Sequence, residues 1–213
     1  MRVNPYNAIK EISQFKDDCL VCFSAGRDSV VMLDLFMKYY KGNMKFVYFY
    51  FVPNLEFKEK ILHYYEKKYG IEIIRKPSWT TLSYTMGKQV RQGEVFKNIR
   101  QETNISYMAT GVRRAESFRR RAYLKGITGV DERNHYFYPL IDWTSKQVAS
   151  YVSLNRLPIG EEYKNGFNHD LSTPDNLTLL YIKNQYPNDY QKIINTFPQL
   201  EAGIKKLEFY RGQ

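Results

Sequence analysis

The stretch Cys19-Leu-Val-Cys-Phe-Ser-Ala-Gly-Arg-Asp-Ser29, followed at once by Val30-Val-Met-Leu-Asp-Leu-Phe36, indicates the fold of this chain. It reads as a short apolar strand, a tight turn of small residues, and a helix that begins at the turn. This geometry aims unpaired backbone N–H groups and the positive end of a helix dipole at one point, and such a point binds phosphate. The alternative is an ordinary strand-to-helix turn, where Gly, Ser and Asp are also common.

Each residue type in the turn suits an anion. We expect Gly26 to adopt a positive φ and to let the backbone approach a ligand closely. The hydroxyls of Ser24 and Ser29 can donate hydrogen bonds to phosphate oxygens, and Asp28 or Ser29 can cap the first helical turn. Arg27 either neutralises phosphate charge or extends into solvent.

A second segment carries arginines after a short apolar run at 106–110 that Gly111 ends. The cluster consists of Arg113, Arg114, Arg119, Arg120 and Arg121. Arginine forks match phosphate or sulfate oxygens in a bidentate way, and a cluster that follows a strand in an α/β sheet lies where ligands usually bind. We favour a ligand role for Arg113 and Arg114. For residues 119–121 a solvated basic face is equally well supported, because three consecutive residues cannot share one helix face.

Three segments resemble one protein family. Ser24–Ser29 resembles the PP-loop (Ser-Gly-Gly-x-Asp-Ser) of the ATP pyrophosphatases, or adenine nucleotide alpha hydrolases, with Ala25 where the family usually has its first glycine. Thr110-Gly-Val-Arg-Arg114 is similar to the Gly-x-Arg-Arg segment of phosphoadenosine phosphosulfate (PAPS) reductases and of the sulfate adenylyltransferase small subunit. Tyr138-Pro-Leu-Ile-Asp-Trp-Thr144, running to Leu157-Pro-Ile159, resembles a third segment of that branch. The chain is therefore identified as a PAPS reductase-like member of the PP-loop superfamily.

The resemblance implies a site for an adenine nucleotide, either ATP or the sulfonucleotides PAPS and adenylyl sulfate (APS), with Mg²⁺ bridging the phosphate charges. The residues implied in nucleotide binding are Ser24, Ala25, Gly26, Arg27, Asp28, Ser29, Gly111 and Arg120. Catalytic roles fall on Asp28, Arg113 and Arg114, the two arginines holding the anionic group of an acceptor. The reaction implied is cleavage of ATP to AMP and pyrophosphate with adenylylation of that acceptor.

The cysteines argue against a thiol-dependent reductase. PAPS reductases carry a catalytic cysteine near the C-terminus, whereas no cysteine follows Cys22 here, and two cysteines cannot hold an iron–sulfur cluster. Cys19 and Cys22 lie at positions i and i+3 of the expected strand and so point to opposite faces. We expect buried thiols rather than a disulfide or a shared metal. The three histidines are scattered and form no metal-ligand pattern.

The net charge of +10 favours anionic partners, either nucleotides or nucleic acid. Three alternatives to an adenylyl-transferring enzyme stay open: a sulfonucleotide-binding enzyme whose partner supplies the thiol, a nucleic-acid modification enzyme, and a nucleotide-binding module without catalysis. The resemblance also allows a partner subunit, as the sulfate adenylyltransferase small subunit needs one. The sequence shows no signal-peptide pattern and no apolar run of membrane-spanning length, so we expect a cytoplasmic protein that does not enter a membrane.

Hydrophobic residues make up 43% of the 213 residues and aromatic residues 16%, which is typical of a folded protein. Alternating strand and helix patterns predict a doubly wound α/β fold at residues 1–160, with helices on both faces of a mainly parallel five-stranded sheet. A small helical C-terminal part is expected at 161–213. The expected strands are 19–23, 45–51, 71–74, 106–110 and 136–140. The expected helices are 5–15, 29–40, 55–69, one beginning at Thr144, and 175–210 with breaks at Pro187 and Pro198; the polar segment 78–104 is predicted to be a lid over the ligand.

Overall fold

A computed structural model of the chain describes residues 5–160 and 176–211. Within these residues the sheet has six strands in the order β3-β2-β1-β4-β6-β5. The strands are β1 (Cys19–Cys22), β2 (Met44–Tyr50), β3 (Ile73–Pro77), β4 (Tyr107–Ala109), β5 (Val130–Asp131) and β6 (Tyr136–Phe137). All neighbours are parallel except β5, which is antiparallel to β6. The α/β class and the mainly parallel sheet are confirmed. The predicted count of five strands misses β5, because two residues are too few to show a strand pattern.

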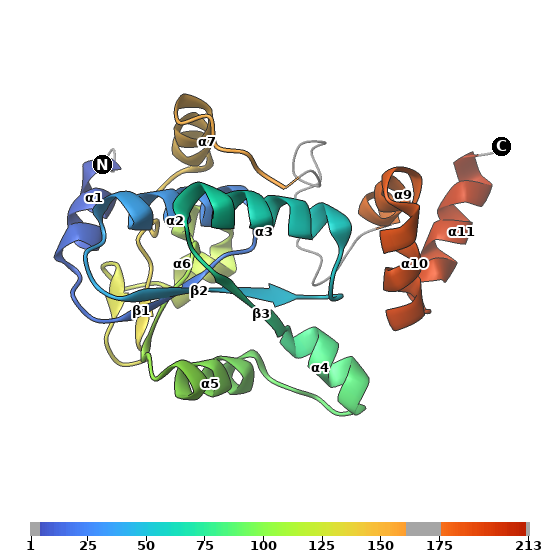
Figure 1. Cartoon of the computed structure of the whole chain (residues 1–213), viewed down its shortest axis with the longest axis horizontal. Coiled ribbons are helices and arrows are strands. Elements are labelled where there is room, and N and C mark those ends of the chain that lie inside the picture. The colour runs from blue at the N-terminus through green and yellow to red at the C-terminus, as the bar shows by residue number, and fades with distance from the viewer. Residues whose placement is uncertain (1–4, 161–175, 212–213) are drawn as a thin grey trace.

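Helices cover both faces of the sheet, as Figure 1 shows. One face carries α1 (Pro5–Gln14), α2 (Arg27–Tyr39), α3 (Glu56–Tyr69) and α7 (Ser145–Leu154), and the other carries α4 (Trp79–Met86) and α5 (Gln92–Thr103). The remaining elements are the short 3₁₀ helix η1 (Arg114–Glu116), α6 (Phe118–Tyr123), α9 (Asn176–Gln185), α10 (Pro187–Thr196) and α11 (Leu200–Arg211). The segment 78–104, which was predicted to be a polar lid, forms the two helices α4 and α5. Its polarity belongs to the outer side of α5, whose Val95, Phe96 and Ile99 are buried.

The alternation of side chains along β1 builds two separate cores. Cys19 and Val21 join the cluster under α2, whereas Leu20 and Cys22 pack in the cluster that contains Phe96 of α5. Both cysteines are free thiols. The prediction that they face opposite sides of the sheet is confirmed, because successive residues of a strand point to opposite faces.

The strand order places a switch point between β1 and β4. The chain leaves β1 toward β2 and β3 on one side, and returns to pair β4 with the other edge of β1. The loops that follow β1 and β4 therefore diverge at the carboxyl ends of these strands. In open α/β sheets this crevice is where ligands bind.

Two helix termini follow the sequence signals closely. Thr144 caps α7 in a reciprocal capping box with Gln147, and the neighbouring Trp143 is a buried packing residue. Pro187 occupies the first turn of α10, and Pro198 lies between α10 and α11. The C-terminal helices were expected to begin at residue 175, which lies outside the described residues.

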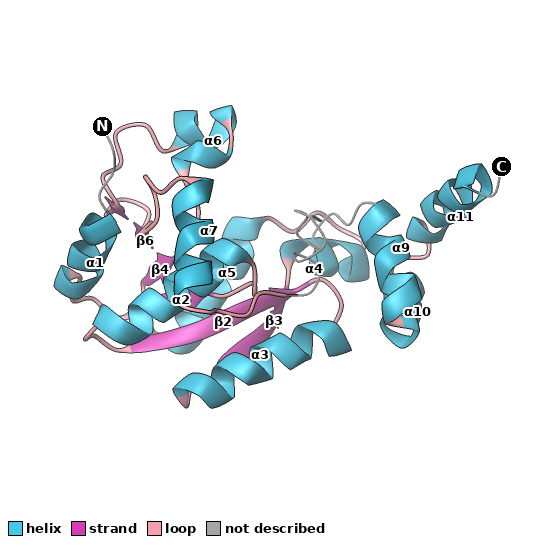
Figure 2. Cartoon of the chain, turned by 90° about the horizontal axis from the view of Figure 1, so that it is seen from above, coloured by secondary structure: helices cyan, strands magenta, loops and turns pink. Residues whose placement is uncertain are grey.

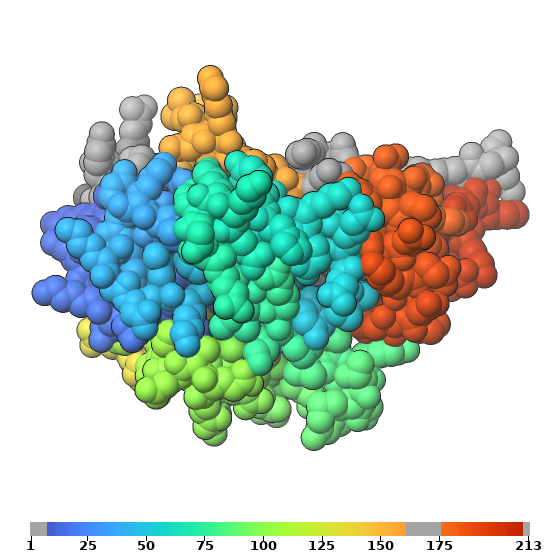
Figure 3. Space-filling view, viewed as in Figure 1, coloured from blue at the N-terminus to red at the C-terminus, as the bar shows by residue number. Residues whose placement is uncertain are grey.

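The C-terminal helices pack against the connection between β2 and α3. Their cluster combines Leu179, Ile182, Ile193, Phe197 and Ile204 with Phe51, Val52, Leu55 and Phe57. The rings of Phe51 and Phe197 stack at 4.1 Å between centroids. Figure 3 shows these helices at the end of the molecule opposite α1. The division of the chain at residue 160 stays a prediction.

A buried carboxylate on α2 ties α3 and α7 together. Asp34 is 2% exposed and accepts hydrogen bonds from the hydroxyls of Tyr69 (2.5 Å) and Tyr151 (2.7 Å). Its carboxylate also pairs with Lys38 Nζ at 2.7 Å. Burial raises the pKa of Asp34, but these hydrogen bonds outweigh it and hold the pKa below its ordinary value.

We expect Asp34→Asn to destabilise the fold by about 2 kcal/mol near neutral pH, because it removes charge-assisted hydrogen bonds from a buried site. A carboxyl whose pKa is lower in the folded state stabilises the fold above its unfolded pKa, and this contribution is lost as the pH falls through the folded pKa. Urea unfolding at several pH values should show the deficit narrowing below about pH 4. The exposed Glu56→Gln is the control, and an Asp34→Asn deficit that does not change with pH would contradict the assignment.

Candidate functional site

A cavity of about 330 Å³ lies at the carboxyl ends of β1 and β4, at the switch point of the sheet. Its walls come from the loop after β1, the loop after β4, one side of β2, the starts of α4 and α5, and α6. The predicted site residues that line it are Ser24, Gly26, Arg27, Asp28, Ser29, Gly111 and Arg120. The structure thus brings together the small-residue turn and the start of the arginine segment. Ala25, Arg113 and Arg114 are not among the lining residues.

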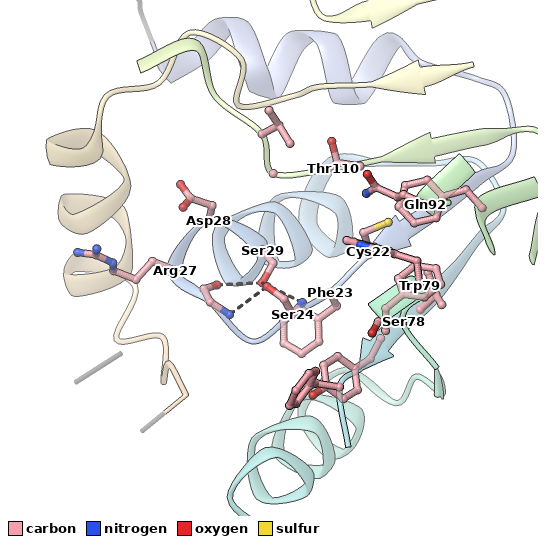
Figure 4. A pocket seen from close by; sticks show the side chains of 18 of the residues that line it. Cys22, Phe23, Ser24, Arg27, Asp28, Ser29, Ser78, Trp79, Gln92 and Thr110 are labelled. Atoms are coloured by element: carbon pink, nitrogen blue, oxygen red, sulfur yellow. Dashed lines mark hydrogen bonds between the residues drawn. The ribbon is translucent and has the colours of Figure 1, made fainter. Parts of the chain in front are cut away.

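The turn after β1 is held by its own serines, as Figure 4 shows. Ser29 Oγ donates to the Gly26 carbonyl at 2.9 Å and accepts from the Ser24 amide at 3.2 Å. The positive φ is at Ala25 (62°), whereas Gly26 has φ −76°, so the expectation for Gly26 was wrong. The Ala25 carbonyl accepts from the Gly160 amide at 3.0 Å, which holds this backbone in place. A non-glycine residue here costs about 1 kcal/mol, which accounts for the glycine that PP-loops usually have.

The N-terminus of α2 points its dipole at the cavity wall. Gly26 is the N-cap, and no side chain of the described residues caps this helix. The amides of its first turn have no intrahelical acceptor, and the positive end of the dipole adds to their field. In Figure 4 the side chain of Arg27 extends away from Ser24 and Ser29. The backbone of the turn is therefore what makes this wall suitable for an anion.

Lys58 is a functional candidate that the sequence reasoning missed. It lies on α3, lines the cavity, is only 4% exposed, and donates from Nζ to the Ser24 carbonyl at 3.5 Å. A buried ammonium beside the turn at 24–29 adds positive charge to this side of the cavity, which favours an anionic ligand. The sequence contains an indication of this burial. Lys58 precedes Ile61, Leu62 and Tyr65 at helical spacing, so all four lie on the same buried face of α3.

The wall on the α4 and α5 side is aromatic. Phe96 packs against Phe49 at 5.2 Å and edge-on against Trp79 at 6.1 Å between ring centroids. Two polar side chains, Gln92 and Thr110, line the same cavity. The buried Oγ1 of Thr110 has no hydrogen-bond partner within the described part of the chain. This wall suits a planar ring with polar edges.

Cys22 also lines the cavity, but its thiol is a weak acid. Burial raises the pKa of its thiol to about 12, and burial raises the pKa of Cys19 as well. A thiol with such a pKa stays protonated near neutral pH and is a poor nucleophile. The expectation of buried thiols holds for Cys19, whereas Cys22 is partly exposed.

The paired arginines take positions different from those expected. Arg113 is 5% exposed; its Nε pairs with the Asp28 carboxylate, and its Nη1 donates to the Trp143 carbonyl at 3.2 Å. Burial raises the pKa of Asp28, although Arg113 acts to lower it. Direct contact between Arg113 and an acceptor was expected from the sequence. In the structure Arg113 is instead paired with Asp28 at the start of α2, and its role toward an acceptor stays a prediction.

Arg114 is also engaged away from the cavity. It pairs with Asp142 and donates to the carbonyls of Leu124 and Ile127. These contacts fasten the loop after β4 to the segment before α7. Arg120 is the member of the arginine segment that lines the cavity, where it pairs with Glu116.

Gly111 brings the two loops into close approach. A Cβ at this position would lie 3.2 Å from Asp28 Cβ and 3.4 Å from the Ser29 amide nitrogen. The absence of a side chain therefore lets the loop after β4 reach the first turn of α2.

The described residues contain no cluster of three or more histidine, cysteine or acidic side chains that could hold a metal ion. Among the described helices, none combines the length and apolarity that crossing a bilayer requires.

Comparisons of the sequence and the fold show which known proteins the chain is similar to. Residues 18–169 match the family described as the phosphoadenosine phosphosulfate reductase domain. An uncharacterised protein of Methanocaldococcus jannaschii is 26% identical over 208 residues, which cover 89% of this chain and 49% of that protein. The chain thus spans about half the length of this curated relative.

Two solved structures share the fold. The phosphate complex of the PAPS reductase from Candida auris has a TM-score of 0.57 and 16% identity, and the match covers 79% of this chain and 87% of that one. The U34-tRNA thiolase NcsA from Methanococcus maripaludis, solved with its [4Fe-4S] cluster, has a TM-score of 0.54 and 14% identity, covering 92% of this chain and 78% of that one.

Proposed function

The chain belongs to the PAPS reductase family of the PP-loop superfamily, and on that premise we propose that it is an adenylyl-transferring ATP pyrophosphatase. In this proposal it binds an adenine nucleotide in the cavity at the switch point and cleaves ATP to AMP and pyrophosphate. The AMP moiety passes to an anionic acceptor. The observation that carries the proposal is the Ser24–Ser29 turn, which forms one wall of the cavity at the N-terminus of α2.

Phosphate binding is assigned to the turn and to Lys58. The first-turn amides of α2, the Ser24 hydroxyl and the buried Lys58 ammonium converge on one side of the cavity. Together they neutralise the charge that develops on a leaving pyrophosphate. Asp28 and Glu116 line the cavity as well, and Mg²⁺ enters as part of the MgATP substrate, since this ion usually binds through one or two carboxylates and the phosphates.

The adenine ring is assigned to the aromatic wall. Phe49, Phe96 and Trp79 offer apolar ring surface, and the Gln92 amide and Thr110 hydroxyl offer polar groups. An amide side chain can pair with the N6 and N7 edge of adenine. The Thr110 hydroxyl, which lacks a partner within the described residues, would gain one from the ring.

The proposed reaction is an in-line displacement at the α-phosphorus. An acceptor oxygen forms a bond to this phosphorus, the bond to the bridging oxygen breaks, and pyrophosphate leaves with the electron pair. The protein supplies positioning and charge neutralisation, and no cysteine is needed.

Lys58→Met tests the phosphate side of the cavity. We expect the affinity for MgATP, measured by isothermal titration, to fall about tenfold to a hundredfold, because a charge-assisted hydrogen bond is lost. Methionine fills the same buried volume, so thermal unfolding should change little. Lys60→Met on the same helix is the control, since its side chain is 59% exposed. Equal affinity in the two variants would contradict the assignment.

Two ATP analogues test the bond that is cleaved. The β,γ-methylene analogue should still be cleaved at the α-phosphorus and release methylenediphosphonate, whereas the α,β-methylene analogue should bind and remain intact. Release of ADP and phosphate from ATP would overturn the proposed cleavage position.

Sulfonucleotide binding is the second candidate, and the family match itself favours it. Titrations with ATP, APS and PAPS under identical conditions separate the two. A PAPS dissociation constant at least tenfold below that of ATP supports the second candidate, and the reverse order supports the first.

A further inference from the structure

Helix α6 is exposed on every side. All residues of 115–123 are exposed, and α6 buries none of its own. Two of its side chains are large and apolar: Phe118 is 82% exposed and Tyr123 is 60% exposed. A helix that contributes nothing to the core and displays aromatic rings indicates a surface for a partner.

The positive charge of this helix indicates the charge that its partner carries. Arg119, Arg120 and Arg121 follow one another on α6, and Lys125 lies just beyond its end. Glu116 is the acidic residue of this stretch, and it pairs with Arg120. Within the described residues, Arg119 and Arg121 have no ion-pair partner. The chain as a whole carries a net charge of +10. An anionic partner is therefore favoured.

Helical spacing places an arginine beside each ring. Phe118 and Arg121 are three residues apart, and Arg119 and Tyr123 are four apart, so each pair shares a side of α6. Phe118 and Tyr123 flank three arginines on α6, and aromatic rings next to positive charge can hold unpaired bases by stacking and their backbone by electrostatic attraction.

The helix is connected to the cavity through one residue. Arg120 lines the cavity, while the neighbouring positions on α6 face outward. In Figure 2 this helix projects from one margin of the molecule, and α3 lies along the opposite margin. A ligand lying on α6 would therefore be next to the mouth of the proposed nucleotide site.

We infer that α6, through Phe118, Arg119, Arg121 and Tyr123, binds an unpaired segment of a nucleic acid and presents it to the cavity. If the proposed function holds, the acceptor of the AMP moiety is then a group of that nucleic acid. Binding itself does not depend on it. An acidic peptide would use the arginines but leave the rings without stacked bases, and a duplex would keep its bases out of reach.

The experiment uses fluorescence anisotropy without ATP, so its result is independent of the proposed reaction. The probe is a short fluorescein-labelled oligoribonucleotide of mixed sequence, compared with the same sequence as DNA and as a duplex. We expect the single strands to bind more tightly than the duplex, and the RNA and DNA arms to reveal which nucleic acid is preferred. Phe118→Ala and Tyr123→Ala should each weaken binding about tenfold, whereas Phe209→Ala on α11 should not.

A second set of titrations tests the role of charge with a double variant, Arg119→Gln and Arg121→Gln, measured at several salt concentrations. We expect the slope of log affinity against log salt to fall by about 1.4, as loss of two phosphate contacts requires for a single strand. The matched control, Lys67→Gln with Lys68→Gln, removes the same charge from exposed positions on α3. MgATP affinity should be unchanged in all of these variants, because none of the substituted residues lines the cavity.

Three results would overturn the inference. They are single-strand binding no tighter than duplex binding, ring variants that bind like the wild type, and a charge control that loses as much affinity as the α6 pair. If binding follows the expected pattern but no AMP is transferred, the interaction surface stands and the proposed reaction fails.

Discussion

Replacing Gly111 with valine should abolish nucleotide binding while the chain stays folded. An added Cβ would lie 3.2 Å from Asp28 Cβ and 3.3 Å from the Asp28 carbonyl carbon, and the valine methyl groups would reach further. The atoms in the way include backbone of the first turn of α2, which cannot swing aside as a side-chain tip can. The turn would have to move, and its amides would no longer converge on a phosphate.

Thermal unfolding with and without MgATP measures this effect. At about 100 times its dissociation constant, a ligand stabilises the folded state by roughly 2.7 kcal/mol. We expect the wild type to show that gain, Gly111→Val to show none, and Gly111→Ala to lie between them. Gly93→Val is the control, since a Cβ there would meet no atom within 4 Å. If Gly111→Val binds MgATP as tightly as the control, the close approach of the two loops has no role in binding.

The parts of the site that sequence reasoning located are local ones. The turn at 24–29 lies within one strand–turn–helix unit, so its small residues and its position at a helix start can be read without knowing the rest of the fold. The opposite faces of Cys19 and Cys22 follow from strand geometry alone. Thr144 and Gln147 form their capping box within one helical turn.

The parts it missed depend on contacts between distant segments. Ala25 carries the positive φ, and its carbonyl is held by the amide of Gly160, from a segment that no local pattern connects to the turn. The pairing of Arg113 with Asp28 requires β4 to lie beside β1, which only the strand order reveals. Lys58 differs, because its helical spacing from Ile61, Leu62 and Tyr65 can be found in the sequence alone, although the sequence analysis did not single it out.

Arg113→Ala should be the most destabilising substitution in the site. The Arg113 side chain is 6% exposed, and its ion pair with Asp28 joins the loop after β4 to the start of α2. Removing the guanidinium leaves the Asp28 carboxylate partly buried without its counter-ion, and breaking such a pair costs about 3–5 kcal/mol. The Trp143 carbonyl also loses a donor.

A double-mutant cycle separates this positioning role from direct contact with an acceptor. Adding Asp28→Ala to Arg113→Ala removes the uncompensated charge, so we expect the pair of substitutions to cost clearly less than the sum of the two single ones. The pH dependence has a defined sign. Burial already raises the pKa of Asp28, and loss of Arg113 removes an influence that lowers it. A carboxylate whose pKa is raised in the folded state destabilises the fold when it is ionised, so the Arg113→Ala deficit should shrink as acid protonates Asp28. Additive costs and a deficit that is constant with pH would show that the two side chains act independently, and Arg113 would then be free to serve an acceptor directly.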